Sequence, residues 1–235
     1  MMTHPRSAFG ASPSRGRRLR TGKAGSAAAA WLLLAACAGG PPPADWQLNA
    51  QSASEAATAA YLAGDSAAET RHFERARSEV SRTGSPQRMA RIELLRCAAH
   101  VASLVFEACP GYERLQADAD APERAYAQYL AGRAQAPDIE LLPAVQRGVA
   151  RGGPAALREV ADPLSRLVAA AVLFQQGRAD PTTIALAVDT ASAQGWRRPL
   201  LAWLNVQLAR AEHAGDTSEA ERLRRRIALA QGLGE

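Results

Sequence analysis

The sequence lacks the short motifs that would mark an enzyme. It contains no G-x-S-x-G nucleophile turn, no H-E-x-x-H zinc pair and no glycine-rich loop followed by lysine and serine or threonine. The glycines of "RGVARGGPAA" follow no strand-like segment, so they do not predict a phosphate site. No nucleophile–base set stands out either. We therefore expect a protein without enzymatic activity and without a cofactor.

Histidine is also scarce, which limits the possible metal sites. Beyond residue 36 the histidines are His72, His100 and His213, which lie far apart in the sequence. Glu69 and His72 have the spacing that places two ligands on one helical face, as in carboxylate-bridged metal sites. Such a site needs a second matching motif, which the sequence lacks. We expect a solvated helix face there, and no metal.

Alternation with period two is absent and β-branched runs are few, which argues against a β-sheet. From Trp46 onward the pattern is helical almost throughout, and segments 88–103, 200–211 and 217–230 each predict an amphipathic helix. In the first of these, small and apolar residues cover one broad arc, and polar residues are expected opposite it: Glu93, Arg96, His100 and Ser103.

Similar turns separate the predicted helices. "YLAGDSAAE" (61–69) and "HAGDTSEAE" (213–221) both end one helix with glycine and begin the next with aspartate and a hydroxyl residue. Either residue of each pair could cap the next helix, and the spacing also predicts two capping boxes, Ser66 with Glu69 and Ser218 with Glu221. Glycines of this kind follow one another at 68, 45 and 38 residues: Gly64, Gly132, Gly177 and Gly215.

A spacing of twice 34 residues with helix–glycine–helix units resembles the tetratricopeptide repeats. Phe73 and Ala76 match the large and small positions of that family's second helix, although its usual alanine is displaced to Ala68 and its closing proline is missing. The resemblance implies an all-α fold: an irregular right-handed α-solenoid of antiparallel helix pairs over residues 46–235. A non-repeating helical bundle is the alternative.

The first 25 residues carry six basic side chains and no acidic one, and an uninterrupted small and apolar run, 27–36, follows them. A basic region, a short apolar region and small residues at its end are the parts of a secretory signal. The run is too short for a membrane-spanning helix, which needs about 20 apolar residues. Arg17-Arg18 would fit twin-arginine export, but the flanking residues match that signal poorly.

The residues Leu34-Ala35-Ala36-Cys37 resemble the lipobox of bacterial lipoproteins. The resemblance implies a signal peptide over 1–36, cleavage before Cys37, and lipidation of Cys37 with diacylglycerol and a fatty acid such as palmitate. Ala38 is not the aspartate associated with inner-membrane retention, so the resemblance implies an outer-membrane lipoprotein facing the periplasm. A Gly- and Pro-rich tether, 37–45, would link it to the helical domain. An ordinary cleaved signal with a free thiol is the alternative.

Cleavage changes the charge argument. Of the 28 basic residues, six precede the cleavage site, which leaves 22 against 23 acidic residues. The sequence pI of about 9.6 is therefore mainly a property of the signal peptide. The mature chain gives no reason to expect a nucleic-acid partner.

Cys97 and Cys109 remain as a pair in an exported chain, where disulfides form. On one unbroken helix they would lie about 18 Å apart, whereas a disulfide needs Cα atoms within about 7 Å. "HVASLVFEACPGY" permits a helix ending near Ser103, an irregular stretch and a return, so we predict a disulfide. Two free buried thiols on a continuous helix are the alternative.

The densest basic patch is "ERLRRRI" (221–227). Arg222, Arg225 and Arg226 could contact an anionic partner, but a solvent-facing last helix with a Glu221–Arg225 pair explains them more simply.

Together these features predict a membrane-anchored interaction or scaffold module of the cell envelope with a protein or peptide partner. The alternative is a non-enzymatic lipoprotein that binds a small ligand or an envelope polymer.

Overall fold

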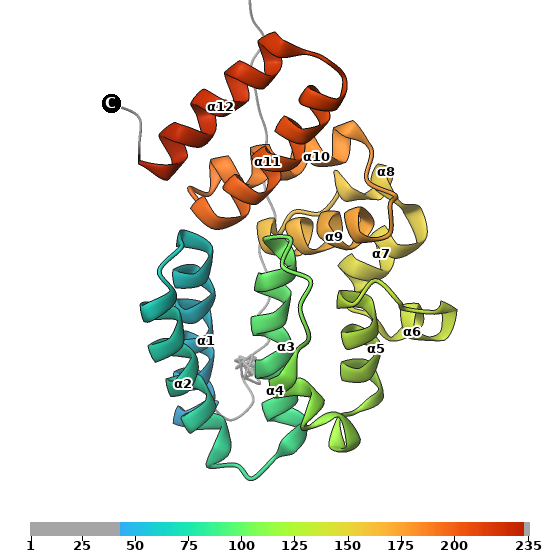
Figure 1. The fold of residues 1–235 in the computed structure, drawn as a ribbon. Coiled ribbons are helices and arrows are strands. Elements are labelled where there is room, and N and C mark those ends of the chain that lie inside the picture. Colours follow the sequence, from blue (N-terminus) through green and yellow to red (C-terminus); the bar gives the residue numbers. More distant parts are fainter. Residues whose placement is uncertain (1–42, 233–235) are drawn as a thin grey trace, which may run out of the picture. The chain divides into compact units, whose positions relative to one another are not determined.

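The computed structural model describes residues 43–232, and within that range every regular element is helical (Figure 1). In chain order the elements are α1 (Asp45–Ala63), α2 (Ser66–Ser81), α3 (Pro86–Ala102), α4 (Pro110–Glu113), the 3₁₀ turn η1 (Gln116–Asp118), α5 (Ala121–Leu130), α6 (Ala136–Leu141), α7 (Ala144–Gly152), α8 (Pro154–Leu157), α9 (Pro163–Gln175), α10 (Pro181–Ala193), α11 (Arg197–His213) and α12 (Thr217–Gln231). Cys37 and the predicted signal peptide lie outside the described residues.

Local sequence signals account for most helix ends. Side chains of aspartate or serine accept a hydrogen bond from the first turn of several helices, and proline occupies the first helical position of α3, α9 and α10. The four predicted turn glycines all have positive φ, at 92°, 70°, 69° and 71° for Gly64, Gly132, Gly177 and Gly215. At Gly64 this left-handed conformation ends α1, because only glycine adopts it without steric cost.

Of the two residues that could cap each helix, the aspartate is the N-cap in both cases, and the two predicted capping boxes are wrong. Asp65 Oδ1 accepts from the Ala68 amide at 2.8 Å, and Asp216 Oδ1 accepts from the Glu219 amide at 2.9 Å. Because Asp65 and Asp216 are the N-caps, the third helical positions are Ala68 and Glu219, one residue before Glu69 and two residues before Glu221. Glu69 is therefore available for a different role, described below.

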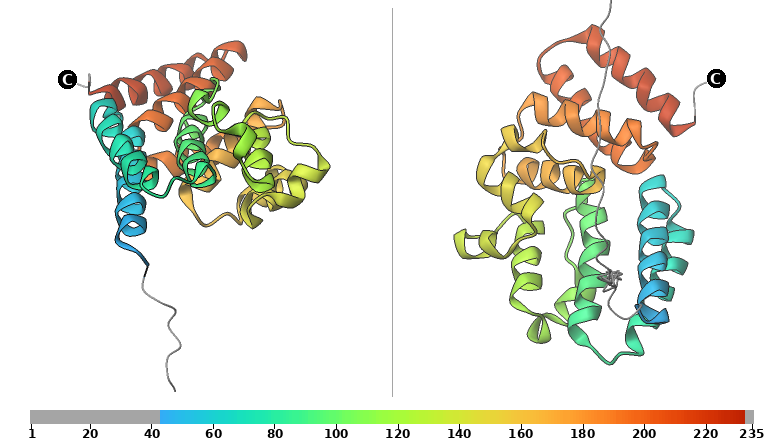
Figure 2. Two further views of the ribbon diagram at one scale, coloured as in Figure 1. Left: turned by 90° about the horizontal axis from the view of Figure 1, so that it is seen from below. Right: turned by 180° about the vertical axis from the view of Figure 1, so that it is seen from behind.

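Helix α3 lies centrally and has helices packed on several sides (Figure 1). Helix α1 packs on α2, α3 contacts α1, α5 and α9, and α10, α11 and α12 follow as successive neighbours. In Figures 1 and 2, α12 lies at the edge of the domain beside α11. The predicted all-α fold with packed helix pairs is confirmed.

Residues far apart in the sequence bring α11 into contact with the first helices of the domain. The Trp203 indole, fully buried on α11, donates to the carbonyl of Ala102 on α3 at 3.2 Å. Arg198, at the start of the same helix, donates to the Tyr61 carbonyl at 2.8 Å and to the Ser66 hydroxyl at 2.8 Å. In a strict solenoid each repeat contacts only its neighbours. The return of α11 to α1 and α3 departs from that pattern.

Four aromatic side chains lie largely inside the core. Trp203 and Tyr129 are 0% and 2% exposed, and Tyr126 and Trp196 are partly buried against the same cluster. Phe73 and Ala76, the positions that resemble the tetratricopeptide pattern, are also buried. Among the described helices, none combines the length and the apolar character needed to cross a membrane.

Candidate binding site beside the disulfide

Cys97 and Cys109 are joined by a disulfide with their Cα atoms 6.1 Å apart, in agreement with the prediction. Helix α3 ends at Ala102, the chain reverses through Leu104 at φ 59°, and residues 105–109 return beside α3 without regular structure. A non-glycine residue in the left-handed region is uncommon and is held there by its surroundings. Here the disulfide fixes the far end of the reversed segment.

A pocket of about 390 Å³ lies between this returning segment, α3 and α5. Its apolar lining comes from Leu94, Val101, Val105 and Leu130. Phe106 also lines it and is 38% exposed, which is unusual for a large aromatic side chain in this domain. The disulfide itself is part of the wall, so the covalent link and the pocket belong to one local structure.

The polar lining is mixed in charge and rich in side-chain amides. Glu107 and Glu113 stand on the side of the returning segment and α4, and Arg133 stands beyond the end of α5. Three glutamines complete it: Gln116, Gln128 and Gln175. The charged members are exposed and the glutamines are exposed or partly buried, so the pocket is an open recess with an apolar floor.

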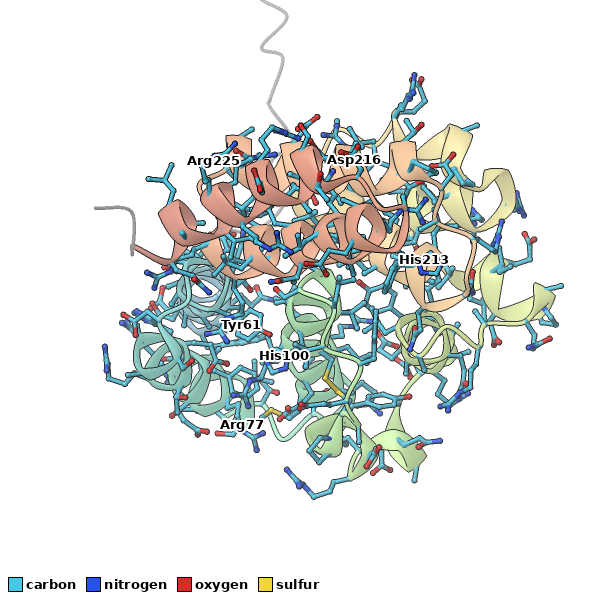
Figure 3. The ribbon with its side chains drawn as sticks, turned by 45° about the horizontal axis from the view of Figure 1, so that its top comes forward. Tyr61, Arg77, His100, His213, Asp216 and Arg225 are labelled. Carbon is cyan, nitrogen blue, oxygen red and sulfur yellow. A yellow bond between two sulfur atoms is a disulfide. The ribbon has the colours of Figure 1, made fainter. Side chains whose placement is uncertain are left out.

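His100 forms the boundary between this pocket and the α1 side of α3. Its ring stacks on Tyr61 with centroids 4.3 Å apart and planes 10° apart, and the Arg198 guanidinium lies 4.3 Å from the Tyr61 ring centroid. Figure 3 shows Tyr61 and His100 side by side at this junction. Burial lowers the pKa of His100, and the nearby Arg96 adds to this. The imidazole is therefore neutral at pH 7.

Three buried glutamates are paired across helices with arginines that reach the surface. Arg96 donates to Glu69 through Nε at 2.7 Å and a terminal nitrogen at 3.2 Å. Arg77 pairs with Glu93, and Arg91 with Glu123. The three carboxylates are 4%, 4% and 6% exposed by residue, so they are fixed parts of the helix contacts.

These glutamates correct two expectations. Glu69 was expected on a solvated face with His72, and Glu93 on the polar side of the 88–103 helix, yet both are buried. Ser103 is buried as well, and its hydroxyl donates to the Ala99 carbonyl at 3.3 Å. A helix that contacts neighbours on several sides has no fully solvated face, so its charged residues are paired inside. Burial raises the pKa of Glu93, against the opposing guanidinium charges of Arg77 and Arg96.

The predicted anionic-partner residues lie on α12. Arg222 makes two 2.6 Å hydrogen bonds to Glu219, while Arg224 pairs with Glu212 on α11 at 2.6 Å. Within residues 43–232, the expected ion pair between Glu221 and Arg225 is not formed. Arg225 is exposed and Arg226 partly buried. The structure does not bring these arginines to the pocket, and within residues 43–232 it contains no group of three metal-ligating side chains.

The pocket was missed by sequence reasoning, although one signal for it was present. The irregular stretch before Cys109 was predicted. A disulfide that holds a non-helical segment against a helix makes the surface uneven there, which favours a pocket. The other wall, α5, gives no such signal because its contact with α3 depends on tertiary packing.

Comparison with the known proteins places no relative beside this chain: no protein-family description, no curated protein and no solved structure matches it. The functional argument therefore depends on the residues described above.

Proposed function

We propose that this protein is a lipid-anchored, periplasm-facing binding module of the bacterial outer membrane that acts through protein–protein contact and without enzymatic activity. The observation that carries the proposal is the recess beside the disulfide, with an apolar floor, an exposed Phe106 and exposed charged residues on its rim. Exposed aromatic residues beside a polar rim are typical of protein contact sites.

The anchor is the second part of the proposal. It is supported by the lipobox-like Leu34-Ala35-Ala36-Cys37 and by the short Gly- and Pro-rich tether that follows. Asp45 lies eight positions after Cys37, a reach of at most roughly 30 Å, so the domain would stay close to its membrane. We also propose that the packed helix pairs form an irregular right-handed solenoid.

A small ligand is the second candidate occupant, because about 390 Å³ falls within the volume of small-molecule sites. Such sites usually bury most of their ligand under apolar and aromatic side chains. Several of the polar residues here are exposed on the rim of an open recess, which favours a protein contact.

The contact site is tested by photo-cross-linking in the membrane. A benzophenone amino acid replaces Phe106 in the full-length protein, and a matched variant carries it at Leu141, which is 44% exposed and lies outside the pocket. We expect discrete protein adducts from position 106 and none from position 141. Equal adduct patterns at both positions, or none at 106, would contradict the proposed contact site.

The anchor is tested separately by metabolic labelling with a palmitate analogue and membrane fractionation. The wild-type chain should incorporate the label and sediment with outer membranes. Cys37→Ser should do neither. A labelled Cys37→Ser protein, or an unlabelled wild type, would remove the anchor from the proposal.

A further inference from the structure

The returning segment presents an unusual amount of unpaired main chain beside the pocket. Within the described residues, the amides of Phe106, Glu107 and Ala108 have no protein acceptor. The carbonyls from Leu104 to Ala108 likewise accept no hydrogen bond from a protein donor. This main chain stands at the edge of a pocket whose apolar floor could hold a side chain.

An open main-chain edge beside a pocket fits one class of ligand well. A peptide in extended conformation has donors and acceptors on both edges and side chains that alternate in direction. Main-chain hydrogen bonds along the edge supply affinity, and the pocket selects the side chain that enters it. The amide side chains of Gln116, Gln128 and Gln175 add donors and acceptors that suit peptide groups.

The charged residues around the pocket indicate which charge the ligand should carry. Glu107 and Glu113 lie on the side of the open main chain, whereas the one arginine of the lining, Arg133, stands beyond the end of α5. Because His100 is neutral at pH 7, it does not offset these carboxylates. A cationic side chain on the peptide would meet them.

We propose that the recess binds an extended peptide segment of a partner protein, which pairs with the main chain of residues 105–108, places an apolar side chain on Leu94 and Leu130 and directs basic side chains toward Glu107 and Glu113. This inference deepens the proposed function and depends on it only for the existence of a protein partner. The disulfide has a positioning role, because it holds Cys109 against α3 and so fixes the open edge.

The test uses defined peptides with the oxidised, full mature chain. The probes are fluorescein-labelled nonapeptides of alternating valine and lysine, the same peptide with every second main-chain nitrogen methylated, and a version with glutamate in place of lysine. Fluorescence anisotropy measures their affinities. We expect the methylated peptide to bind about tenfold more weakly, since it loses two or three hydrogen bonds, and the glutamate peptide to bind more weakly than the lysine peptide.

Variants locate the binding on the protein. Glu107→Gln combined with Glu113→Gln should reduce the preference for the lysine peptide, whereas Glu159→Gln, an exposed carboxylate outside the pocket, should leave it unchanged. Cys97→Ser combined with Cys109→Ser should weaken binding of all three peptides. Helical content by circular dichroism shows whether that variant stays folded.

Two outcomes overturn the proposal. Equal affinity for the methylated and unmethylated peptides would show that the main-chain edge is not used. Absence of binding by every probe would show that the recess does not accept an extended peptide. Both comparisons use the wild-type chain and do not depend on how any variant folds. Cross-linking at position 106 can still succeed in either case, so failure of this inference is distinct from failure of the proposed function.

Discussion

At the scale of single residues, the buried glutamates decide how charge is accommodated between the helices. Glu69 and Glu93 occupy similar environments, yet their partners differ in geometry. Arg96 meets Glu69 with two nitrogens and also lies 4.4 Å from the Phe73 ring centroid. At Glu93 burial outweighs the attraction of its arginines and raises the pKa. The sequence places both residues on helices, but it cannot show their partners, which are 27 and 16 residues away.

Glutamine substitutions at Glu69 and Glu93 should change the free energy of unfolding differently. Glu69→Gln should lower the free energy of unfolding by about 1–3 kcal/mol, because it breaks a charge-assisted pair. Glu93→Gln should leave it unchanged or raise it at pH 7, because a raised folded-state pKa means that the site favours the neutral form. Urea unfolding monitored by circular dichroism measures both values.

The pH dependence of stability tests whether the ionised Glu93 carboxylate is destabilising. The destabilising cost of its carboxylate is present above the raised folded-state pKa and disappears below the ordinary value of 4.5. The stability difference between wild type and Glu93→Gln should therefore shrink as the pH falls toward about 4. A difference that grows on acidification would contradict this account.

His100 should make the stability depend on pH in the opposite direction. Its pKa is lowered from 6.5, so the unfolded state takes up its proton first and stability falls as the pH drops below about 6.5. His100→Gln should flatten this part of the stability curve, measured by urea unfolding at a series of pH values. The charged groups that face His100 from the surrounding elements are Arg96, Glu69, Glu107 and Arg198.

At the scale of the helices, the turns were the most predictable feature. A glycine with positive φ and a helix cap depend on a few consecutive residues, so Gly64 could be placed from the sequence and each cap could be narrowed to two residues. The short helices between α5 and α9 were not anticipated individually, because their limits depend on the neighbours that they contact.

A pair of alanine substitutions should distinguish conformational strain from steric contact at these turns. Gly64→Ala should cost more than about 1–2 kcal/mol, because its methyl group would lie 3.1 Å from the Arg197 guanidinium in addition to the left-handed strain. Gly177→Ala also has a positive φ, 69°, and has open space around it, so it should cost only the strain.

Chemical denaturation of the two variants measures the difference directly. Adding Arg197→Ala to Gly64→Ala should recover the excess, and adding it to Gly177→Ala should not. Equal costs at the two glycines would show that the guanidinium moves aside freely.

At the scale of the whole domain, the sequence predicted the fold class but not the contact of α11 with α1 and α3. Helical periodicity and glycine spacing suggested an array in which each unit contacts the next. The return of α11 to α1 and α3 depends on Trp203 and Arg198, and their partners lie 101 and 137 residues away. Contacts over such separations leave no local pattern.

The last helix should be separable from the rest. Helix α12 packs mainly on α11, so truncation after Gly215 should remove its helical signal and leave α1 and α3 protected from hydrogen exchange. Truncation after Gly195 also removes α11 and its contacts with Tyr61 and Ala102. In that variant we expect exchange in α1 and α3 to become fast. Equal protection in both variants would contradict the bridging role of α11.

The contact of α11 with the start of the domain also has a mechanical consequence. A pulling force on the chain before Asp45 enters the domain through α1, and α1 contacts α2, α3 and α11. Tension is therefore shared with the C-terminal half through Arg198 and does not simply peel off the first helix pair. On a molecule held by its N-terminus, the first helix to receive the load would also be a helix that α11 contacts.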